Sequence, residues 1–180
     1  MKTATPCSFS SAELTTLGAV CERLFPPTAS WLGAGAAGVP VYVAAAVSGG
    51  DDQLRNFYRE GIADLDSESV ASFGSRFSEL AAQKQDAILE RAEKADAAAG
   101  AEVGRRLEAF FGVVWEHAIQ GMFCDPQYGG NWDSLGWKLV GFPGAQWGYS
   151  AEQMKEGFDS RVIVIKTLLD LKNELKVKNV

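Results

Sequence analysis

The segment 101–123, AEVGRRLEAFFGVVWEHAIQGMF, constrains the fold of this chain more than any other stretch. Its apolar residues recur every three or four positions, which is the period of an α-helix. They are Val103, Leu107, Phe110, Phe111, Val114, Ala118 and Met122, with Trp115 and Ile119 beside them. Because more than half of the circumference of this helix is apolar, other helices must cover it. The segment therefore predicts an all-α domain with this helix at its centre.

The N-terminal part of the chain predicts two helices joined by a glycine-rich turn. Ser10 and Glu13 have the spacing of a capping box, and two prolines end the helix that they begin. The stretch 28–38 contains GAGAAG, which matches the GxGxxG pattern of dinucleotide-binding loops. That pattern requires a preceding strand, whereas a helix precedes it here. We interpret 28–38 as a tight turn into a short helix over 39–48.

The middle of the chain predicts two more helices. Asp51 or Asp52 caps the first of them. Its buried stripe consists of Leu54, Phe57, Tyr58, Ile62 and Leu65, and a break is expected around 67–74. The segment 76–100 is predicted to be helical, and its inward-facing residues are Phe77, Leu80, Ile88 and Leu89. The alanine-rich stretch 92–101 is predicted to be an exposed helix end or a loop.

A long glycine- and aromatic-rich loop is expected after the central helix, within GMFCDPQYGGNWDSLGWKLVGFPGAQWG at 121–148. Asp125-Pro126 and the run from Gly129 to Asn131 are turn signals. A loop of about 25 residues without regular structure is uncommon in a compact domain and is usually functional. Large aromatic side chains on such a loop are typical of the core of a protein interface, although they can equally cover the domain's own core. The candidate interface residues are Tyr128, Trp132, Trp137, Phe142, Pro143 and Trp147.

The last residues, 149–180, are predicted to be a C-terminal extension that forms a tail or a helix. Within it, RVIVIKTLL at 161–169 begins like a strand, but no strand partner is evident, so we predict it to be helical. The whole chain, 1–180, is then a single compact helical domain.

The chain offers few residues for catalysis. His117 is the single histidine, and Asp125 follows it just beyond the expected end of the helix. A free-standing enzyme that uses His117, Asp125 and Tyr128 as acid and base groups is one alternative. The more common role of a lone helical histidine beside aromatic residues is structural. The stretch PQYGGNWD has no Lys or Arg beside its glycines and no preceding strand, so it does not form a phosphate cradle.

The net charge and the cysteine spacing exclude several classes of partner and cofactor. A net charge of −6 argues against a nucleic-acid partner. No apolar run approaches the length of about 20 residues that a membrane span needs. The cysteines Cys7, Cys21 and Cys124 lack CxxC spacing, so no metal and no cofactor are expected in this chain. A bridge between Cys7 and Cys21 in an oxidising compartment and a pair of free thiols are both compatible with the sequence.

Four segments resemble the gluconate 2-dehydrogenase subunit 3 family. The most specific is EAFFGVVWEHAIQGMFCDPQYGGNWDSLGWKLVGFPG, with its motif D-P-x-Y-G-G-N followed by G-W and G-F-P-G. The others are LTTLGAVCERLFPPTASWLGAGAAGVPVYV, FYREGIADLD and RFSELAAQKQDAILE. The resemblance covers roughly residues 10–148 and leaves the last 30 or so outside it.

The resemblance implies a non-catalytic small subunit. In this family the large partner is an FAD-dependent flavoprotein of the glucose-methanol-choline type, which oxidises a sugar, a glycoside or a polyol. A cytochrome c subunit or another electron acceptor is a further implied partner. The small subunit is expected to stabilise the large one and to help it to fold or to be exported. A chaperone that dissociates after folding its client is the second alternative.

The resemblance favours the periplasm, because many members of the family carry a twin-arginine signal. This sequence departs from that pattern, since no arginine pair precedes a hydrophobic stretch. Arg105 and Arg106 lie within the central helix and do not form such a signal. Either a mature form or a member that acts in the cytoplasm fits the sequence.

Overall fold

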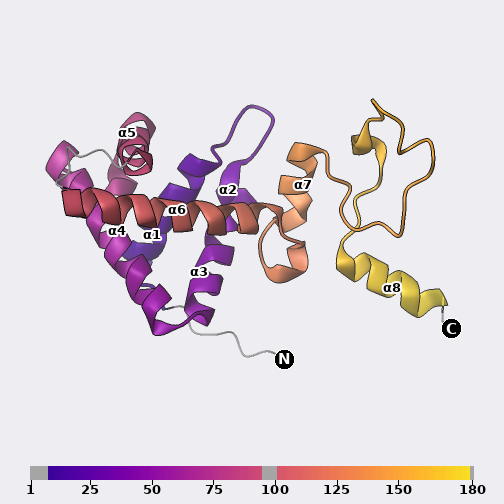
Figure 1. Cartoon of the computed structure of the whole chain (residues 1–180), viewed down its shortest axis with the longest axis horizontal. Coiled ribbons are helices and arrows are strands. Elements are labelled where there is room, and N and C mark those ends of the chain that lie inside the picture. The colour runs from indigo at the N-terminus through magenta and orange to yellow at the C-terminus, as the bar shows by residue number, and fades with distance from the viewer. Residues whose placement is uncertain (1–7, 95–100, 179–180) are drawn as a thin grey trace.

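The computed structural model describes residues 8–94 and 101–178, and within these two ranges it contains helices and no strands. A bundle of helices forms the N-terminal part (Figure 1). It consists of α1 Ser11–Leu24, α2 Gly33–Ala36, α3 Val39–Gly49, α4 Asp52–Phe73, the 3₁₀ turn η1 Phe77–Glu79, α5 Ala82–Glu93 and α6 Ala101–Phe123. The predicted all-α fold is confirmed.

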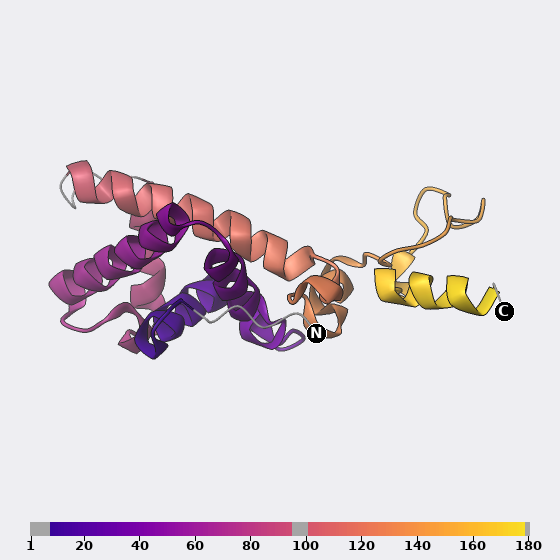
Figure 2. The ribbon, with the colours of Figure 1, turned by 90° about the horizontal axis from the view of Figure 1, so that it is seen from below.

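Beyond α6 the chain leaves the bundle in one direction (Figures 1 and 2). The elements there are η3 Pro126–Tyr128, η4 Trp132–Ser134, α7 Leu135–Val140, η5 Ser160–Val162 and α8 Leu168–Lys178. Helix α7 lies beside the end of α6, and the residues that follow it extend away from the bundle. We call residues 141–178 the C-terminal arm. The expected loop after α6 is thus interrupted by one short α-helix and two 3₁₀ turns.

Helix α6 runs along one side of the bundle (Figure 2), and its predicted burial is only partly right, because Trp115 and Ile119 are 39% and 36% exposed. It packs against α3, α4 and α5. Its buried apolar residues are Leu107, Phe110, Val114, Ala118 and Met122. The contact with α4 is close, because a β-carbon on Gly61 would lie 2.2 Å from Cδ2 of Phe110. A glycine on α4 therefore makes room for a phenylalanine ring from α6.

Local signals set the ends of two helices. The Ser10 amide donates to Oε2 of Glu13 at 2.7 Å, and the Glu13 amide donates to Oγ of Ser10 at 3.3 Å, so the predicted capping box is present. Asp51 caps α4 by accepting a hydrogen bond from the amide of Leu54 at 2.8 Å. The break predicted around 67–74 comes only at Gly74, since α4 continues to Phe73 and Gly74 caps its end with φ of 80°. Its serines are compatible with a helix, because the Ser69 hydroxyl donates to the Leu65 carbonyl at 2.7 Å.

The prediction of a helix over 161–169 is also wrong for most of that segment. After η5, residues 163–167 are outside any helix, and the backbone of Lys166 pairs with the chain next to Gly144. The Ala145 amide donates to the Lys166 carbonyl at 2.7 Å, and the Lys166 amide donates to the Pro143 carbonyl at 3.2 Å. β-Branched residues such as those of this segment favour extended backbone. They find a partner in the arm itself, and α8 begins only at Leu168.

Across residues 8–94 and 101–178, no helix combines the length and the apolar character that a membrane crossing requires. Part of the alanine-rich stretch 92–101, residues 95–100, lies outside the described residues, as does Cys7. The inward-facing set predicted for 76–94 is confirmed, because Phe77, Leu80, Ile88 and Leu89 are all buried.

Candidate partner interface

The loop after α6 caps the end of that helix. The last carbonyl groups of a helix have no partner within it and must find one elsewhere. The Asn131 amide donates to the Gly121 carbonyl at 2.7 Å, and Nδ2 of Asn131 donates to the Cys124 carbonyl at 2.8 Å. Nε1 of Trp137 donates to the Phe123 carbonyl at 2.8 Å. The loop thus provides hydrogen-bond donors for the carbonyl groups at the C-terminal end of α6.

The structure explains why the last two residues of the GGN run are a glycine and an asparagine. Asn131 is fully buried with φ of 48°, a left-handed conformation that asparagine tolerates better than most residues. Its Oδ1 accepts a hydrogen bond from the amide of Gly136 at 2.8 Å. A β-carbon on Gly130 would lie 2.3 Å from the Gly121 carbonyl oxygen, and one on Gly136 would lie 1.9 Å from that of Met122. Only glycine allows this approach.

Asp125 joins the loop to the C-terminal arm. Its carboxylate is buried, and Oδ1 accepts a hydrogen bond from the amide of Gln127 at 3.0 Å. Its Oδ2 accepts one from the amide of Leu168 at 2.7 Å, at the first residue of α8. A carboxylate at a helix N-terminus interacts favourably with the free amides and the helix dipole there. Asp125 therefore holds the start of α8 next to the end of α6.

The six candidate interface residues fall into two groups. Trp137 and Pro143 are buried within this chain. Tyr128, Trp132, Phe142 and Trp147 are exposed, with exposed fractions of 64%, 42%, 46% and 57%. Phe142 nevertheless packs edge to face on Trp137, with ring centroids 5.3 Å apart. The structure thus leaves four of the six side chains accessible to a partner.

Trp132 links the loop to the glycine-rich turn of the N-terminal region. Its amide donates to the Ala37 carbonyl at 2.9 Å, and its ring covers Gly38, where a β-carbon would come within 2.4 Å of Cε2. On the other side of the turn, Oε2 of Glu22 accepts a hydrogen bond from the amide of Gly35 at 2.7 Å. The glycines of GAGAAG therefore accommodate contacts within the chain, and they follow helix α1 rather than a strand.

Helix α7 and the C-terminal arm carry many exposed apolar residues, of which the sequence analysis named Phe142 and Trp147. From α7 to the end of α8, the large apolar residues that are at least 36% exposed are Leu139, Val140, Phe142, Trp147, Tyr149, Met154, Val162, Val164, Leu168, Leu169, Leu175 and Val177. Exposed apolar residues mark interaction sites where they form a contiguous patch. The signal in the sequence was the run VIVI at 162–165, which we assigned to a helix.

His117 and Asp125 do not share a hydrogen bond. Nδ1 of His117 lies 2.7 Å from the hydroxyl of Tyr58, and the two rings stack. Burial lowers the pKa of His117 from its ordinary value of 6.5, although the nearby Glu116 carboxylate acts in the opposite direction. Burial also raises the pKa of Tyr58. This pair is a polar contact inside the bundle between α4 and α6, whereas Asp125 binds the backbone of the loop and of the arm.

Cys21 and Cys124 are free thiols. Cys21 is completely buried, and burial raises the pKa of its thiol to about 12, with the neighbouring Glu22 adding to the shift. A thiol with so high a pKa is a poor nucleophile and metal ligand. In the described part of the chain no group of three or more His, Cys, Asp or Glu residues is arranged to hold a metal ion.

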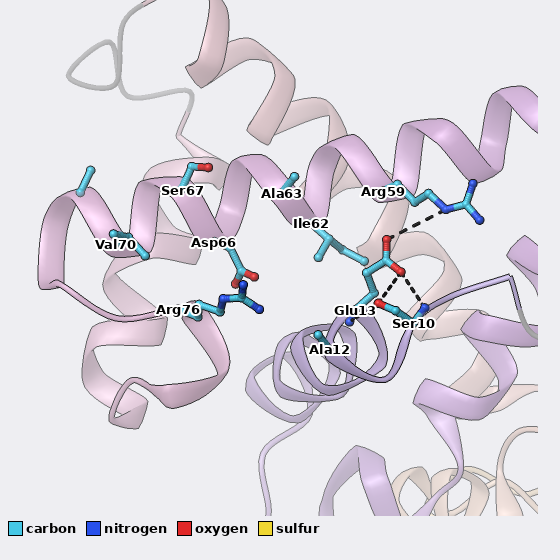
Figure 3. A pocket seen from close by; sticks show the side chains of 11 residues that line it. Ser10, Ala12, Glu13, Arg59, Ile62, Ala63, Asp66, Ser67, Val70 and Arg76 are labelled. Carbon is cyan, nitrogen blue, oxygen red and sulfur yellow. Dashed lines mark hydrogen bonds and ion pairs between the residues drawn. The ribbon is translucent and has the colours of Figure 1, made fainter.

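A groove of about 900 Å³ lies between α1 and α4 (Figure 3). It is lined by two arginines, Arg59 and Arg76, and by two carboxylates, Glu13 and Asp66. Nε of Arg59 lies 4.0 Å from Oε1 of Glu13, and Arg76 points toward Asp66 in Figure 3. Because the two charges of each sign balance, the groove does not select for a charged ligand.

The comparisons with known proteins agree with the motif in the loop. The family model described as gluconate 2-dehydrogenase subunit 3 matches residues 11–144. The match includes the whole bundle, the loop and α7, and it ends at the start of the C-terminal arm. Comparison with curated proteins and with solved structures gave no match.

Proposed function

Because this chain belongs to the gluconate 2-dehydrogenase subunit 3 family, we propose that it is the non-catalytic small subunit of a dehydrogenase complex. Its partner in this proposal is a large FAD-dependent flavoprotein of the glucose-methanol-choline type. That flavoprotein holds the FAD and oxidises a sugar, a glycoside or a polyol. A cytochrome c subunit or another acceptor then takes the electrons. The small subunit stabilises the flavoprotein and helps it to fold.

One observation carries this proposal, namely the exposed apolar surface of the C-terminal arm. The bundle has a buried core of its own, whereas Val162, Val164 and Val177 of the arm are each more than 70% exposed. A partner that covers this surface gains the free energy of burying apolar area, about 25 cal/mol per Å². Exposed aromatic residues such as Trp147 add the side chains that most often dominate binding.

Co-purification tests the proposal. The chain is tagged and expressed with the flavoprotein dehydrogenase of the same genome, and the purified material is examined for both polypeptides, flavin absorbance and sugar oxidation. We expect a complex with constant stoichiometry in which the flavin belongs to the large subunit. The tagged chain expressed alone is the control, and we expect it to bind no flavin. Stoichiometric flavin in that control would contradict the proposal.

The same experiment separates the proposal from its rivals. A dissociating chaperone would raise the yield of active flavoprotein while being absent from the purified enzyme. An enzyme based on His117 and Asp125 would oxidise or hydrolyse a substrate without any partner. Both of these carry weaker support, because each of the two side chains already has a partner within the fold.

We place the complex in the periplasm, in line with the family resemblance. Fractionation of cells that express both subunits tests this placement. We expect the flavoprotein in the periplasmic fraction only when the small subunit is expressed with it. Complete retention of both in the cytoplasm would contradict the placement and leave the subunit role intact.

A further inference from the structure

A small pocket lies where α7 meets the C-terminal arm. Its volume is about 220 Å³, and it is lined mainly by Trp137, Lys138, Phe142, Arg161, Ile163 and Ile165. We call it the Trp137 pocket. Pockets for drug-sized molecules usually have volumes of about 300–1,000 Å³. The Trp137 pocket is therefore of a size for one inserted side chain rather than for a cofactor.

Hydrogen bonds hold the two walls of the pocket together. The Ser160 hydroxyl donates to the Gly141 carbonyl at 2.6 Å, which ties η5 to the end of α7. Nε2 of Gln146 donates to the carbonyls of Pro143 and Val164 at 2.8 and 3.0 Å. A preformed pocket loses little conformational entropy when it is filled, and this favours its use as a binding site.

The charges around the Trp137 pocket are unbalanced. Lys138 and Arg161 are exposed, and neither forms an ion pair with another described residue. The lining of the pocket contains no carboxylate. The groove between α1 and α4, by contrast, has two carboxylates beside its two arginines. Lys138 and Arg161 therefore place two cations beside an apolar floor, and the nearby Asp159 carboxylate accepts a hydrogen bond from the Arg161 amide at 3.1 Å.

We propose that the Trp137 pocket receives a single apolar side chain of the large flavoprotein subunit, with an adjacent carboxylate of that subunit bound between Lys138 and Arg161. The inference rests on the proposed function and names the feature of the partner that this surface recognises. A protein partner is favoured over a small acid, because Leu139, Val140, Val162 and Val164, which neighbour the lining residues in sequence, are themselves exposed. A protein surface covers such residues, whereas a small hydrophilic ligand leaves them in water.

Charge reversal in the full-length chain tests the pocket. The variant Lys138→Glu/Arg161→Glu is compared with Arg76→Glu/Arg105→Glu, which changes two exposed cations of the bundle by the same total charge. The affinity of each purified chain for the large flavoprotein subunit is measured at low and at physiological salt. We expect the pocket variant to bind at least about 10-fold more weakly and the control to bind like the wild type. Phe142→Ala is expected to weaken binding by about 10-fold or more.

The outcomes distinguish this inference from the function on which it rests. If the wild-type chain itself does not bind the flavoprotein, the proposed function fails. If the wild type and both double variants bind it equally well, the pocket inference is overturned and the function stands. Self-association of the wild type that is lost only in the pocket variant would assign the pocket to a second copy of this chain. If the isolated wild-type chain binds gluconate and the pocket variant does not, the pocket is a site for a small acid. Either of these two results overturns the inference.

Discussion

Asn131 is the residue that does most to hold the loop on α6. Three of its polar groups, the amide, Oδ1 and Nδ2, bind backbone groups of the loop and the helix end. It is fully buried, so each broken hydrogen bond would leave a polar group without water. Its role in the D-P-x-Y-G-G-N motif is therefore explained by folding, without any catalytic step.

Asn131→Ala is expected to lower the free energy of unfolding by about 2–4 kcal/mol, because it leaves the Cys124 carbonyl and the Gly136 amide unsatisfied. Urea denaturation measures the change. Asn131→Gly is the matched control, since it removes the same hydrogen bonds but adopts φ of 48° without strain. If Asn131→Gly is as stable as the wild type, the side-chain hydrogen bonds contribute nothing.

The lowered pKa of His117 predicts that the stability of the folded chain depends on pH. Burial lowers its pKa below 6.5, so the unfolded chain binds a proton more readily than the folded chain. The contribution of His117 to stability is then complete above pH 6.5 and decreases as the pH falls through the lowered pKa. Thermal unfolding of wild type and His117→Gln across this range measures it, and we expect a smaller slope for the variant. NMR titration of the single imidazole provides the pKa directly; a value above 6.5 would refute the account.

At the scale of elements, glycines set how closely the helices approach. Gly61 on α4 faces the Phe110 ring of α6, and Gly136 on α7 faces the Met122 carbonyl. The spacing of apolar residues within either helix does not predict these contacts, because each contact depends on which residue the neighbouring helix places opposite the glycine. Gly112, in contrast, lies on α6 at a position where a β-carbon would meet no atom of a neighbouring element within 4 Å.

Gly61→Ala is expected to destabilise the bundle by about 1–3 kcal/mol, because the new methyl group would collide with Phe110. The greater helix propensity of alanine, about 1 kcal/mol, offsets only part of this cost. Gly112→Ala is the matched control and is expected to stabilise the chain by about 0.5–1 kcal/mol. Chemical denaturation of both variants decides the matter. Equal stability of the two variants would show that α4 and α6 can separate freely at this point.

For the whole molecule, the main division is between the bundle and the C-terminal arm (Figure 2). The bundle packs a core of large apolar residues, although Leu32, Val41 and Val70 are 68%, 53% and 49% exposed, and most of the large apolar residues of the arm are exposed. Asp125 joins the arm to the end of α6, and the pairing of Lys166 with the Pro143–Ala145 backbone holds two segments of the arm together. We therefore expect substitutions in the bundle to change the free energy of unfolding and substitutions of exposed residues in the arm to change binding to the partner.

Trp137 and Trp147 test this separation. Trp137 is 5% exposed, so Trp137→Ala is expected to lower the free energy of unfolding by about 3–5 kcal/mol. Trp147 is 57% exposed, so Trp147→Ala is expected to unfold like the wild type and to bind the flavoprotein about 10- to 100-fold more weakly. Thermal melting of the isolated chain and affinity for the flavoprotein are measured in parallel. Normal assembly of a stable Trp147→Ala chain would move the docking surface elsewhere.

The sequence alone determined the helices whose signals are local. The capping box at Ser10, the Asp51 cap and the apolar period of 101–123 each involve residues within one or a few turns. For that reason the bounds of α6 agree with the prediction. The family motif was also local, since it lies in one continuous stretch that the family model matches.

Tertiary structure decided which aromatic residues are buried and how residues 141–178 are arranged. Several contacts join positions that are far apart in the chain. Trp137 is hydrogen-bonded to the Phe123 carbonyl, the Trp132 ring covers Gly38, and the Leu168 amide donates a hydrogen bond to Asp125. Residues 163–167 are outside any helix, and Lys166 pairs with the 143–145 backbone, a neighbour that local periodicity does not reveal. Contacts of this kind depend on the relative placement of whole segments, which a pattern of residues within one segment does not encode.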